Sequence, residues 1–341
     1  MRVPVIGGTN FIGPHVITQL HQQGHELTVY HRGVHEPNLP SAVRHLHSSR
    51  AAIPILHFPS ALNTPAPDVV LHMFPVGAED TRAAVARFTG IAQRIVAVSS
   101  GDVYRAYGRL RNTEPGPPEP MPLEEDAPLR ETHFPYRQAA AGPADWTYHY
   151  EKILAERALL ESRLPATVLR LPAVYGVGDP QHRLRPYVRR MQDQRPVILI
   201  DALQAGWRWT HGYVEEVARA ITAAVVDPRA TGKVYSVGEA STPTMAERIH
   251  QIGRLMGWQG QLRSVNSQLL PRHLQMPFTA WQDVVMDSRR IRVELDYTEA
   301  VSDEEGVRRT IEYEQRSQLV PGDPSAQEYA AEDQAVQRGE T

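Results

Sequence analysis

Residues 3–13 read VPVIGGTNFIG, and this stretch decides the fold. A short apolar run ends in two glycines, and residues 11–23 then carry apolar side chains at helical spacing. Gly24 follows this helical pattern as a C-cap glycine would, and residues 26–30 are rich in strand-forming side chains. We therefore predict a strand, a glycine turn, a helix and a second strand within the first 32 residues.

The glycine turn predicts a dinucleotide site. Glycine permits a tight turn and lets a pyrophosphate approach the backbone N–H groups at the start of the helix. An ordinary strand–helix turn is the alternative, but the position between a strand and an amphipathic helix favours the dinucleotide. The expected cofactor contacts are Gly7, Thr9, Asn10, Phe11, Ile12 and Gly13.

The same alternation of apolar runs and helical patterns continues along the chain. Strands are expected near residues 42–46, 68–73, 94–99 and 167–171, and helices at 80–88 and 148–161. This pattern predicts an α/β fold, a Rossmann-type doubly wound parallel sheet with a smaller C-terminal substrate domain. The expected Rossmann domain covers residues 1–172, with 206–238 returning to it, and residues 173–205 and 239–320 form the substrate domain.

Composition excludes several classes of protein. The 341 residues contain no cysteine, which excludes disulfides, thiolate metal sites and cysteine nucleophiles and favours a cytoplasmic protein. The formal net charge is -3, so no global basic field attracts nucleic acid. No apolar run reaches the roughly 20 residues of a membrane-spanning helix. Only two of the 36 basic residues, Lys152 and Lys233, are lysines.

Lys152 stands four residues after Tyr148, a spacing that puts both side chains on one face of a helix. A phenol titrates near about 10, so it serves as an acid–base at neutral pH only when a nearby cation stabilises the phenolate. A chain that otherwise uses arginine keeps a lysine here, whereas Lys233 sits in a surface turn. Upstream, Ser100 follows a buried strand, at the edge of the sheet where ligands bind in open α/β folds. Its hydroxyl is suited to orient a substrate.

The end of the second strand bears on the choice of dinucleotide. An acid there would bind the adenine ribose of NAD, but the chain has His31 and Arg32. The guanidinium of Arg32 suits a 2′-phosphate, which favours NADP slightly within an NAD(P) site. Stacking on adenine and exposure to solvent are alternatives for Arg32.

These features in this order resemble the extended short-chain dehydrogenase/reductase family, in particular its sugar-nucleotide epimerase and dehydratase group. The likeness includes the glycine turn, residues 99–104 (SSGDVY), Tyr148 with Lys152, residues 170–176 (RLPAVYG), 208–218 (RWTHGYVEEVA) and 235–238 (YSVG). It departs at Asn10, which replaces the usual middle glycine, and at Ser49, where the family often has an adenine-contacting acid. The Asn10 variant also occurs in RNA-binding relatives.

The resemblance implies a set of roles. Tyr148 would be the acid–base, Lys152 would lower its pKa and bind the nicotinamide ribose, and Ser100 would orient the substrate. Pro172 and Val174 would lie in the segment that closes over the nicotinamide, and Arg208 would contact a substrate phosphate. The implied activity is NAD(P)-dependent hydride transfer at a hydroxyl or keto carbon, with a sugar nucleotide as the small-molecule substrate and a homodimer as the assembly.

Two other functions stay open. One is an NADP-dependent carbonyl reductase, which Arg32 favours. The other is a non-catalytic dinucleotide- or RNA-binding protein on the same fold, against which the acidic balance argues because phosphate contacts need a basic surface.

Four further features of the sequence lead to predictions. The proline- and acid-rich residues 112–145 predict a lid or a passive insertion. The arginines at 183, 185, 189 and 190 predict a solvated helix face, or else contacts to a diphosphate. The histidines show no zinc-binding signature, so no metal site is expected. The acidic residues 321–341 predict a solvated, partly disordered tail.

Overall fold

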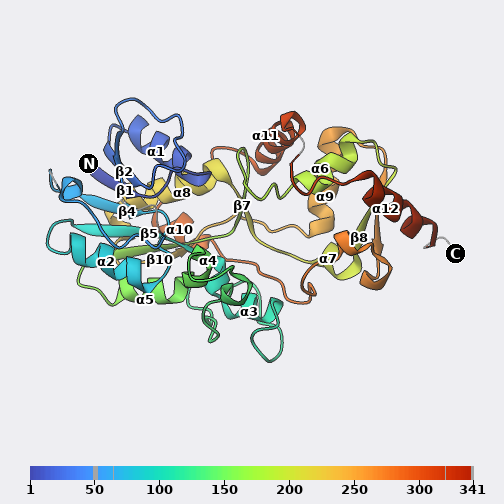
Figure 1. Ribbon diagram of the computed structural model, residues 1–341, viewed down its shortest axis with the longest axis horizontal. Helices are drawn as coiled ribbons and strands as arrows, with labels where there is room; N and C mark the ends of the chain where they lie inside the picture. Colours follow the sequence, from blue (N-terminus) through green and yellow to red (C-terminus); the bar gives the residue numbers. More distant parts are fainter. Residues whose placement is uncertain (49–52, 64, 319, 339–341) are drawn as a thin grey trace.

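The computed structural model describes residues 1–48, 53–63, 65–318 and 320–338 (Figure 1). Its centre is a seven-stranded sheet in the order β10-β6-β5-β4-β1-β2-β3, and every strand pair is parallel. The strands are β1 (Arg2–Ile6), β2 (Glu26–His31), β3 (Arg44–His47), β4 (Val69–His72), β5 (Arg94–Ser100), β6 (Ala166–Leu171) and β10 (Val234–Ser236). The predicted Rossmann-type sheet is therefore confirmed.

Helices cover both faces of this sheet because each buries one apolar stripe. On one face, α1 (Ile12–Gln22) packs beside α8 (Val214–Val226), and Val16, Ile17 and Leu20 join Val3 and Val5 of β1 in the core. On the other face, α2 (Ala78–Phe88) packs beside α5 (Lys152–Leu160). The order of strands makes the gap between β1 and β4 the switch point, where ligands bind in such sheets.

A second set of elements lies at the opposite end of the molecule from the sheet (Figure 1). It contains a parallel pair of strands, β8 with β11, and the chain crosses to it through the parallel pair β7 with β9. The bounds are β7 (Ala173–Tyr175), α6 (Arg185–Gln192), β8 (Val197–Asp201), α7 (Ala202–Gly206), β9 (His211–Tyr213), α9 (Met245–Met256), β11 (Gln261–Val265), α11 (Asp303–Arg316) and α12 (Ala326–Arg338).

The remaining helices and turns are short. They are α3 (Arg105–Leu110), α4 (Trp146–His149) and α10 (Arg289–Glu294), with 3-10 turns η1 (Ser60–Asn63), η2 (Gly101–Val103), η3 (Arg137–Ala139), η4 (Pro228–Ala230), η5 (Ser267–Leu269) and η6 (Arg272–Leu274). In the described ranges, no helix is both long enough and apolar enough to cross a bilayer.

Residues 112–145 are held by polar and backbone contacts, some within the segment and some to the rest of the molecule. The Glu114 carboxylate accepts hydrogen bonds from the N–H groups of Glu131 and Thr132, at 2.9 and 2.7 Å. The Glu125 carboxylate accepts from the N–H of Ser236 in β10 at 3.0 Å, and Leu123 pairs with Met286. The prediction of a lid or a passive insertion stays open, but Glu114, Leu123, Glu125 and Arg130 are buried and fix the segment at these points.

The expectation of a partly disordered acidic tail is wrong for residues 326–338. They form α12, in which Glu332 and Ala335 are buried. Glu332 accepts from Arg190 of α6 at 2.5 and 3.1 Å and from His273 at 2.9 Å. Acidic composition suggested solvation, but the acids are partners of basic groups far away in the sequence.

Candidate functional site

The glycine turn has the geometry that its sequence predicts. Gly7 and Gly8 have φ of 77° and 81°, in the left-handed region that glycine tolerates without strain. Gly13, in the first turn of α1, packs directly against the glycine turn, and a Cβ at this position would lie 2.0 Å from the carbonyl oxygen of Gly8. Only glycine therefore allows the helix to approach the turn so closely.

A cavity of about 450 Å³ lies over this turn, along the edge of β1, β2 and β4. Its wall includes Phe74, Val76 and Val98 and is closed by Trp146 and Pro180. Of the predicted cofactor residues, this wall contains Gly7, Thr9, Asn10, Phe11, Ile12 and Arg32. The cavity thus occupies the switch point of the sheet, where a dinucleotide fits.

His72 is an unexpected member of this wall. It ends β4, is 2% exposed, and neither ring nitrogen has a hydrogen-bond partner among the described residues. Burial, with a smaller contribution from the charge of Lys152, lowers the pKa of His72 to about 3. A buried polar group without a partner at the wall of a cavity fits the binding of a polar ligand there.

Lys152 lies directly behind the cavity. Its Nζ donates hydrogen bonds to the carbonyl oxygens of Pro75 at 2.6 Å and Val98 at 3.1 Å, and its side chain is buried. Burial lowers the pKa of Lys152 from 10.5 to about 8, while nearby carboxylates oppose the shift. An ammonium with this pKa is present at neutral pH, next to the cavity wall.

The predicted continuous helix over residues 148–161 is wrong. Helix α4 ends at His149 and α5 begins at Lys152, so Tyr150 and Glu151 break the helix between Tyr148 and Lys152. The Glu151 carboxylate accepts from the N–H of Ile153 at 3.0 Å and pairs with the buried guanidinium of Arg130. These tertiary contacts hold Glu151 as the N-cap of a new helix, and the four-residue spacing no longer guarantees a shared face.

As a consequence, Tyr148 is not among the groups that contact the Lys152 amine. Its ring packs 4.7 Å from the guanidinium carbon of Arg137, whose Nε donates to the Tyr148 carbonyl at 3.0 Å. Tyr148 is half-buried and is not part of the cavity wall.

Tyr150 is the tyrosine that accompanies Lys152. Its ring centre lies 5.5 Å from Lys152 Nζ, and its hydroxyl donates to Asp102 Oδ2 at 2.9 Å. Tyr136 donates to the same carboxylate oxygen at 3.0 Å. Burial, with the Asp102 charge next, raises the pKa of Tyr150 well above its ordinary value, and hydrogen bonding to Ser100 opposes this shift.

The two serines at the end of β5 have different environments. Ser99 is buried, and its hydroxyl donates to Glu156 at 2.5 Å. Ser100 is partly exposed, and its hydroxyl accepts from the N–H of Asp102 at 3.2 Å. Ser100, Asp102, Tyr150 and Lys152 therefore form one polar group next to the cavity. Sequence reasoning did not single out Asp102 or Tyr150 as site residues. The available signal for Asp102 was its position two residues after the buried strand, and the signal for Tyr150 was its position two residues before Lys152.

Three other predicted residues lie outside the cavity wall. Pro172 contacts Gly212, where an added Cβ would lie 3.0 Å from Pro172 Cγ, and the Val174 carbonyl accepts from Arg183 at 2.7 Å. Arg208 is exposed and donates to the Thr242 carbonyl at 2.9 Å. Ser49 lies outside the described residues.

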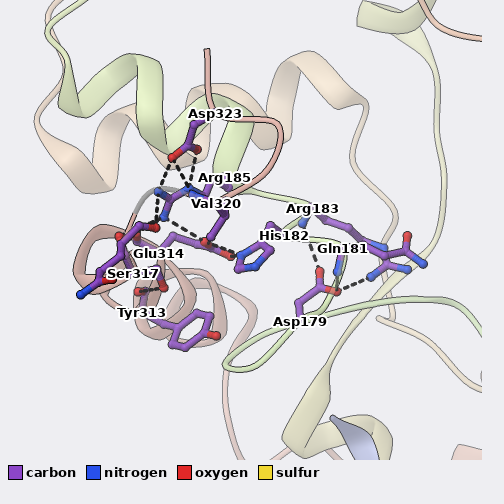
Figure 2. Close-up of polar contacts among 11 residues, drawn as sticks. Asp179, Gln181, His182, Arg183, Arg185, Tyr313, Glu314, Ser317, Val320 and Asp323 are labelled. Carbon is purple, nitrogen blue, oxygen red and sulfur yellow. Dashed lines mark hydrogen bonds and ion pairs between the residues drawn. The ribbon is translucent and has the colours of Figure 1, made fainter. Parts of the chain in front are cut away.

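The arginine cluster is not the solvated helix face that its sequence predicts. Arg185 is 4% exposed and pairs with Asp323 at 2.6 Å and with Glu314 at 3.6 Å (Figure 2). Arg183 pairs with Asp179 at 2.7 Å, on the other side of His182 (Figure 2). Arg190 pairs with Glu332. Arg185 and Arg190 thus tie α6 to Glu314 of α11 and Glu332 of α12, while Arg189 pairs with Asp193 directly after α6. With these carboxylate partners, the cluster gives no support for the diphosphate alternative either.

A second cavity, of about 570 Å³, lies between β9 and α11. Its wall contains Arg254 and five carboxylates: Glu216, Glu239, Glu247, Glu299 and Asp303. Burial raises the pKa of Glu239 to about 7 against the opposing charge of Arg248. An acidic wall of this kind is a poor match for a diphosphate.

Comparison with known proteins agrees with the fold. The model of the NAD dependent epimerase/dehydratase family matches residues 3–238. A comparison with curated sequences gives no match.

Three solved structures illustrate the likeness. UDP-glucuronic acid 4-epimerase from Bacillus cereus, in complex with UDP-glucuronic acid and NAD, superposes with a TM-score of 0.65 at 16% identity, over 93% of this chain and 99% of that one. UDP-glucose 4-epimerase from Thermotoga maritima, with UDP-glucose, gives 0.65 at 18% identity over 93% and 99%. The Thermus thermophilus UDP-glucose 4-epimerase complex with NAD gives 0.61 at 19% identity over 93% and 100%. Identities this low show the fold alone, whereas the family model matches more than half of the sequence. The chain belongs to the NAD dependent epimerase/dehydratase family.

Proposed function

We propose that the protein transfers a hydride to and from a hydroxyl-bearing carbon of a sugar nucleotide or a related sugar, as an epimerase or dehydratase. One observation carries the proposal: the glycine turn lines a cavity at the switch point of the sheet, and Lys152 lies behind the wall of that cavity, hydrogen-bonded to the carbonyls of Pro75 and Val98. The UDP-sugar epimerases with a similar fold support the substrate class.

The residues present fit an NAD(P) cofactor. The N–H groups of the turn and of the start of α1 are suited to a pyrophosphate, and His72, whose ring nitrogens have no partner among the described residues, lies in the wall of the same cavity. When bound, the nicotinamide supplies the hydride acceptor and donor. A tyrosine takes the proton of the substrate hydroxyl as the carbon loses its hydride, and returns it on reduction. Ser100 orients the substrate oxygen.

Two tyrosines compete for the acid–base role, and different observations favour each. Tyr148 has the expected four-residue spacing to Lys152. Tyr150 has the contacts: the hydroxyl bonds to Asp102, and the ring lies beside Lys152. The neighbouring Asp102 carboxylate disfavours a phenolate, so Tyr150 in this arrangement stays protonated and donates a hydrogen bond to Asp102. To take the proton of the substrate hydroxyl, Tyr150 must pass its own proton to that carboxylate.

Parallel Tyr148→Phe and Tyr150→Phe variants test the proposal and distinguish the tyrosines. The assay follows UDP-glucose and UDP-glucuronic acid by NMR, with nucleotide binding measured separately. We expect one variant to lose at least about 100-fold in turnover while dinucleotide binding persists, because general acid–base catalysis contributes at least this much. Full turnover in both variants would show that neither residue is the acid–base.

A second candidate, an NADP-dependent carbonyl reductase, is favoured by Arg32 in the cavity wall and by the absence of an acid at the end of β2. A guanidinium there suits a 2′-phosphate. Mass spectrometry of the nucleotide carried through gentle purification separates the candidates. A retained NAD favours the epimerase, whereas an NADPH that exchanges freely and is oxidised to NADP as a carbonyl substrate is reduced favours the reductase.

We expect Arg32→Ala to weaken NADP binding more than NAD binding, by about 10-fold, because a charge-assisted contact to the 2′-phosphate would be lost. The two affinities are measured by calorimetry. An equal loss for both nucleotides would mean that Arg32 stacks on adenine or only supports the fold.

A further inference from the structure

Three histidines and a glutamate meet at the end of β2, independently of the proposed reaction. His31 ends β2, His45 and His47 lie two residues apart on the neighbouring strand β3, and Glu36 lies in the connection that follows β2. Each offers one ligand atom, and these four atoms lie within 4.8 Å of one another. Because they come from two strands and a loop, no short sequence motif reveals them.

The strand register explains why the histidines converge. His31 pairs with His47 across the parallel ladder, and side chains two residues apart on a strand share a face, so His45 and His47 point the same way. The His31 ring meets the other two nearly edge-on, with centroids 5.2 Å from His45 and 4.6 Å from His47. Glu36 then reaches the open side of the group.

The distances between the four ligand atoms suit a small cation with tetrahedral coordination. His31 Nε2 lies 3.0 Å from His45 Nδ1, and Glu36 oxygens lie 2.8 Å from His47 Nε2, 3.6 Å from His45 Nδ1 and 4.0 Å from His31 Nε2. Zinc bonds of about 2.0–2.2 Å to nitrogen and oxygen place neighbouring tetrahedral ligands about 3.3–3.5 Å apart. The observed spacings bracket this range, so small side-chain movements complete the coordination.

We propose that His31, Glu36, His45 and His47 bind one Zn²⁺ or a similar divalent transition-metal ion. Three imidazole nitrogens and one carboxylate oxygen fill four positions with protein ligands, which is the pattern of a closed, structural site rather than a catalytic one with an open position. His31 is 2% exposed, while the other three reach solvent, so the ion enters from outside and is held against the core.

Metal binding also changes one local contact. The N–H of Gly33 donates to His31 Nδ1 at 3.2 Å, so Nε2 of the neutral ring carries the proton and points to His45. An ion on Nε2 moves that proton to Nδ1 and breaks the Gly33 contact. The ion therefore replaces a hydrogen-bonded turn by metal bonds that tie residues 31–36 to β3, beside Arg32 and His35 in the wall of the dinucleotide cavity.

Zinc titration of the full chain, without a histidine tag and stripped with a chelator, tests this site. Calorimetry should give one Zn²⁺ per chain with micromolar or tighter affinity, and Co²⁺ in its place should give the visible absorption of four-coordinate cobalt. The thermal midpoint should rise when zinc is added. Absence of binding at 100 µM Zn²⁺, or a six-coordinate cobalt spectrum, would overturn the proposal.

Variants assign the binding to these residues. His45→Gln/His47→Gln should weaken zinc binding at least about 10-fold and abolish the thermal shift. Glu36→Gln, at a half-exposed position, is a second variant should the double one fail to fold. His250→Gln is the matched control, because His250 is an exposed histidine of α9 outside the group. Equal zinc affinity in the wild type and a folded cluster variant would contradict the assignment, as would an equal loss in His250→Gln.

Discussion

At the residue scale, the most demanding contact of the site is the one between Gly13 and the carbonyl of Gly8. We expect Gly13→Ala to lower dinucleotide affinity at least about 10-fold, because a Cβ 2.0 Å from Gly8 O forces α1 away from the turn. Gly206→Ala is the control, since nothing lies within 4 Å of an added Cβ there. Calorimetric titration with NAD and NADP measures both variants, and unchanged affinity in Gly13→Ala would contradict the turn as the pyrophosphate site.

Lys152 gives the site a pH dependence whose sign follows from its burial. Its pKa is about 8 in the folded protein and 10.5 when unperturbed, so between these values the unfolded chain holds a proton that the folded chain has lost. Stability therefore rises with pH across this window, and the gain is lost again as pH falls from 10.5 to 8. Relative to Lys152→Met, the wild type should gain about 3 kcal/mol between pH 8 and 10.5, measured by urea unfolding. A difference that stays flat with pH would mean an ordinary pKa for this amine.

At the scale of the element, the break between α4 and α5 marks the limit of sequence patterns. Periodicity and the Tyr148–Lys152 spacing predicted one helix, because both are local signals. The break comes from distant partners: the N–H of Glu151 donates to the Val76 carbonyl at 2.8 Å, and its carboxylate pairs with Arg130. The lysine could thus be predicted from composition and spacing, whereas the tyrosine beside it could not.

Helix α12 also could not be predicted from local sequence, because its acidic residues pair with distant arginines. Two adjacent acids, Glu332 and Asp333, test which of these ion pairs attaches the helix to the rest of the protein. Breaking a buried ion pair leaves an uncompensated charge, so Glu332→Ala should cost about 3–5 kcal/mol by stranding the buried guanidinium of Arg190. Asp333 pairs with Arg195 but is 53% exposed, and Asp333→Ala should cost less than about 1 kcal/mol. Urea unfolding of both full-length variants gives the comparison. Similar costs would mean that the buried pair is not what fastens α12.

At the scale of the whole molecule, the sheet was largely predictable because most of its strands have local sequence signals, although β10 was indicated only by the family resemblance. Buried parallel strands read as apolar runs, and the glycine turn fixes where the first helix begins. The histidine group at the end of β2 was not predictable in this way, since it depends on the register between β2 and β3. The arginines of α6 failed for a related reason. A charged side chain suggests an exposed position, but arginines 185 and 190 are buried because carboxylates far away in the sequence, in α11, in α12 and between them, pair with them.

One apolar cluster runs through both ends of the molecule, which predicts cooperative unfolding. It joins Val5 of the sheet to Ile249 of α9 and Val307 of α11. Val307 is fully buried, so Val307→Ala should cost about 2 kcal/mol, whereas Val293→Ala, at a position 76% exposed, should stay within about 0.5 kcal/mol. Because the cluster is continuous, Val307→Ala should shift the transition of the entire chain rather than split it. Far-UV circular dichroism reports both ends, and tryptophan fluorescence is a second probe of the same transition. Two separated transitions, with only one of them moved by Val307→Ala, would mean that the Rossmann sheet and the α9–α11 end fold independently.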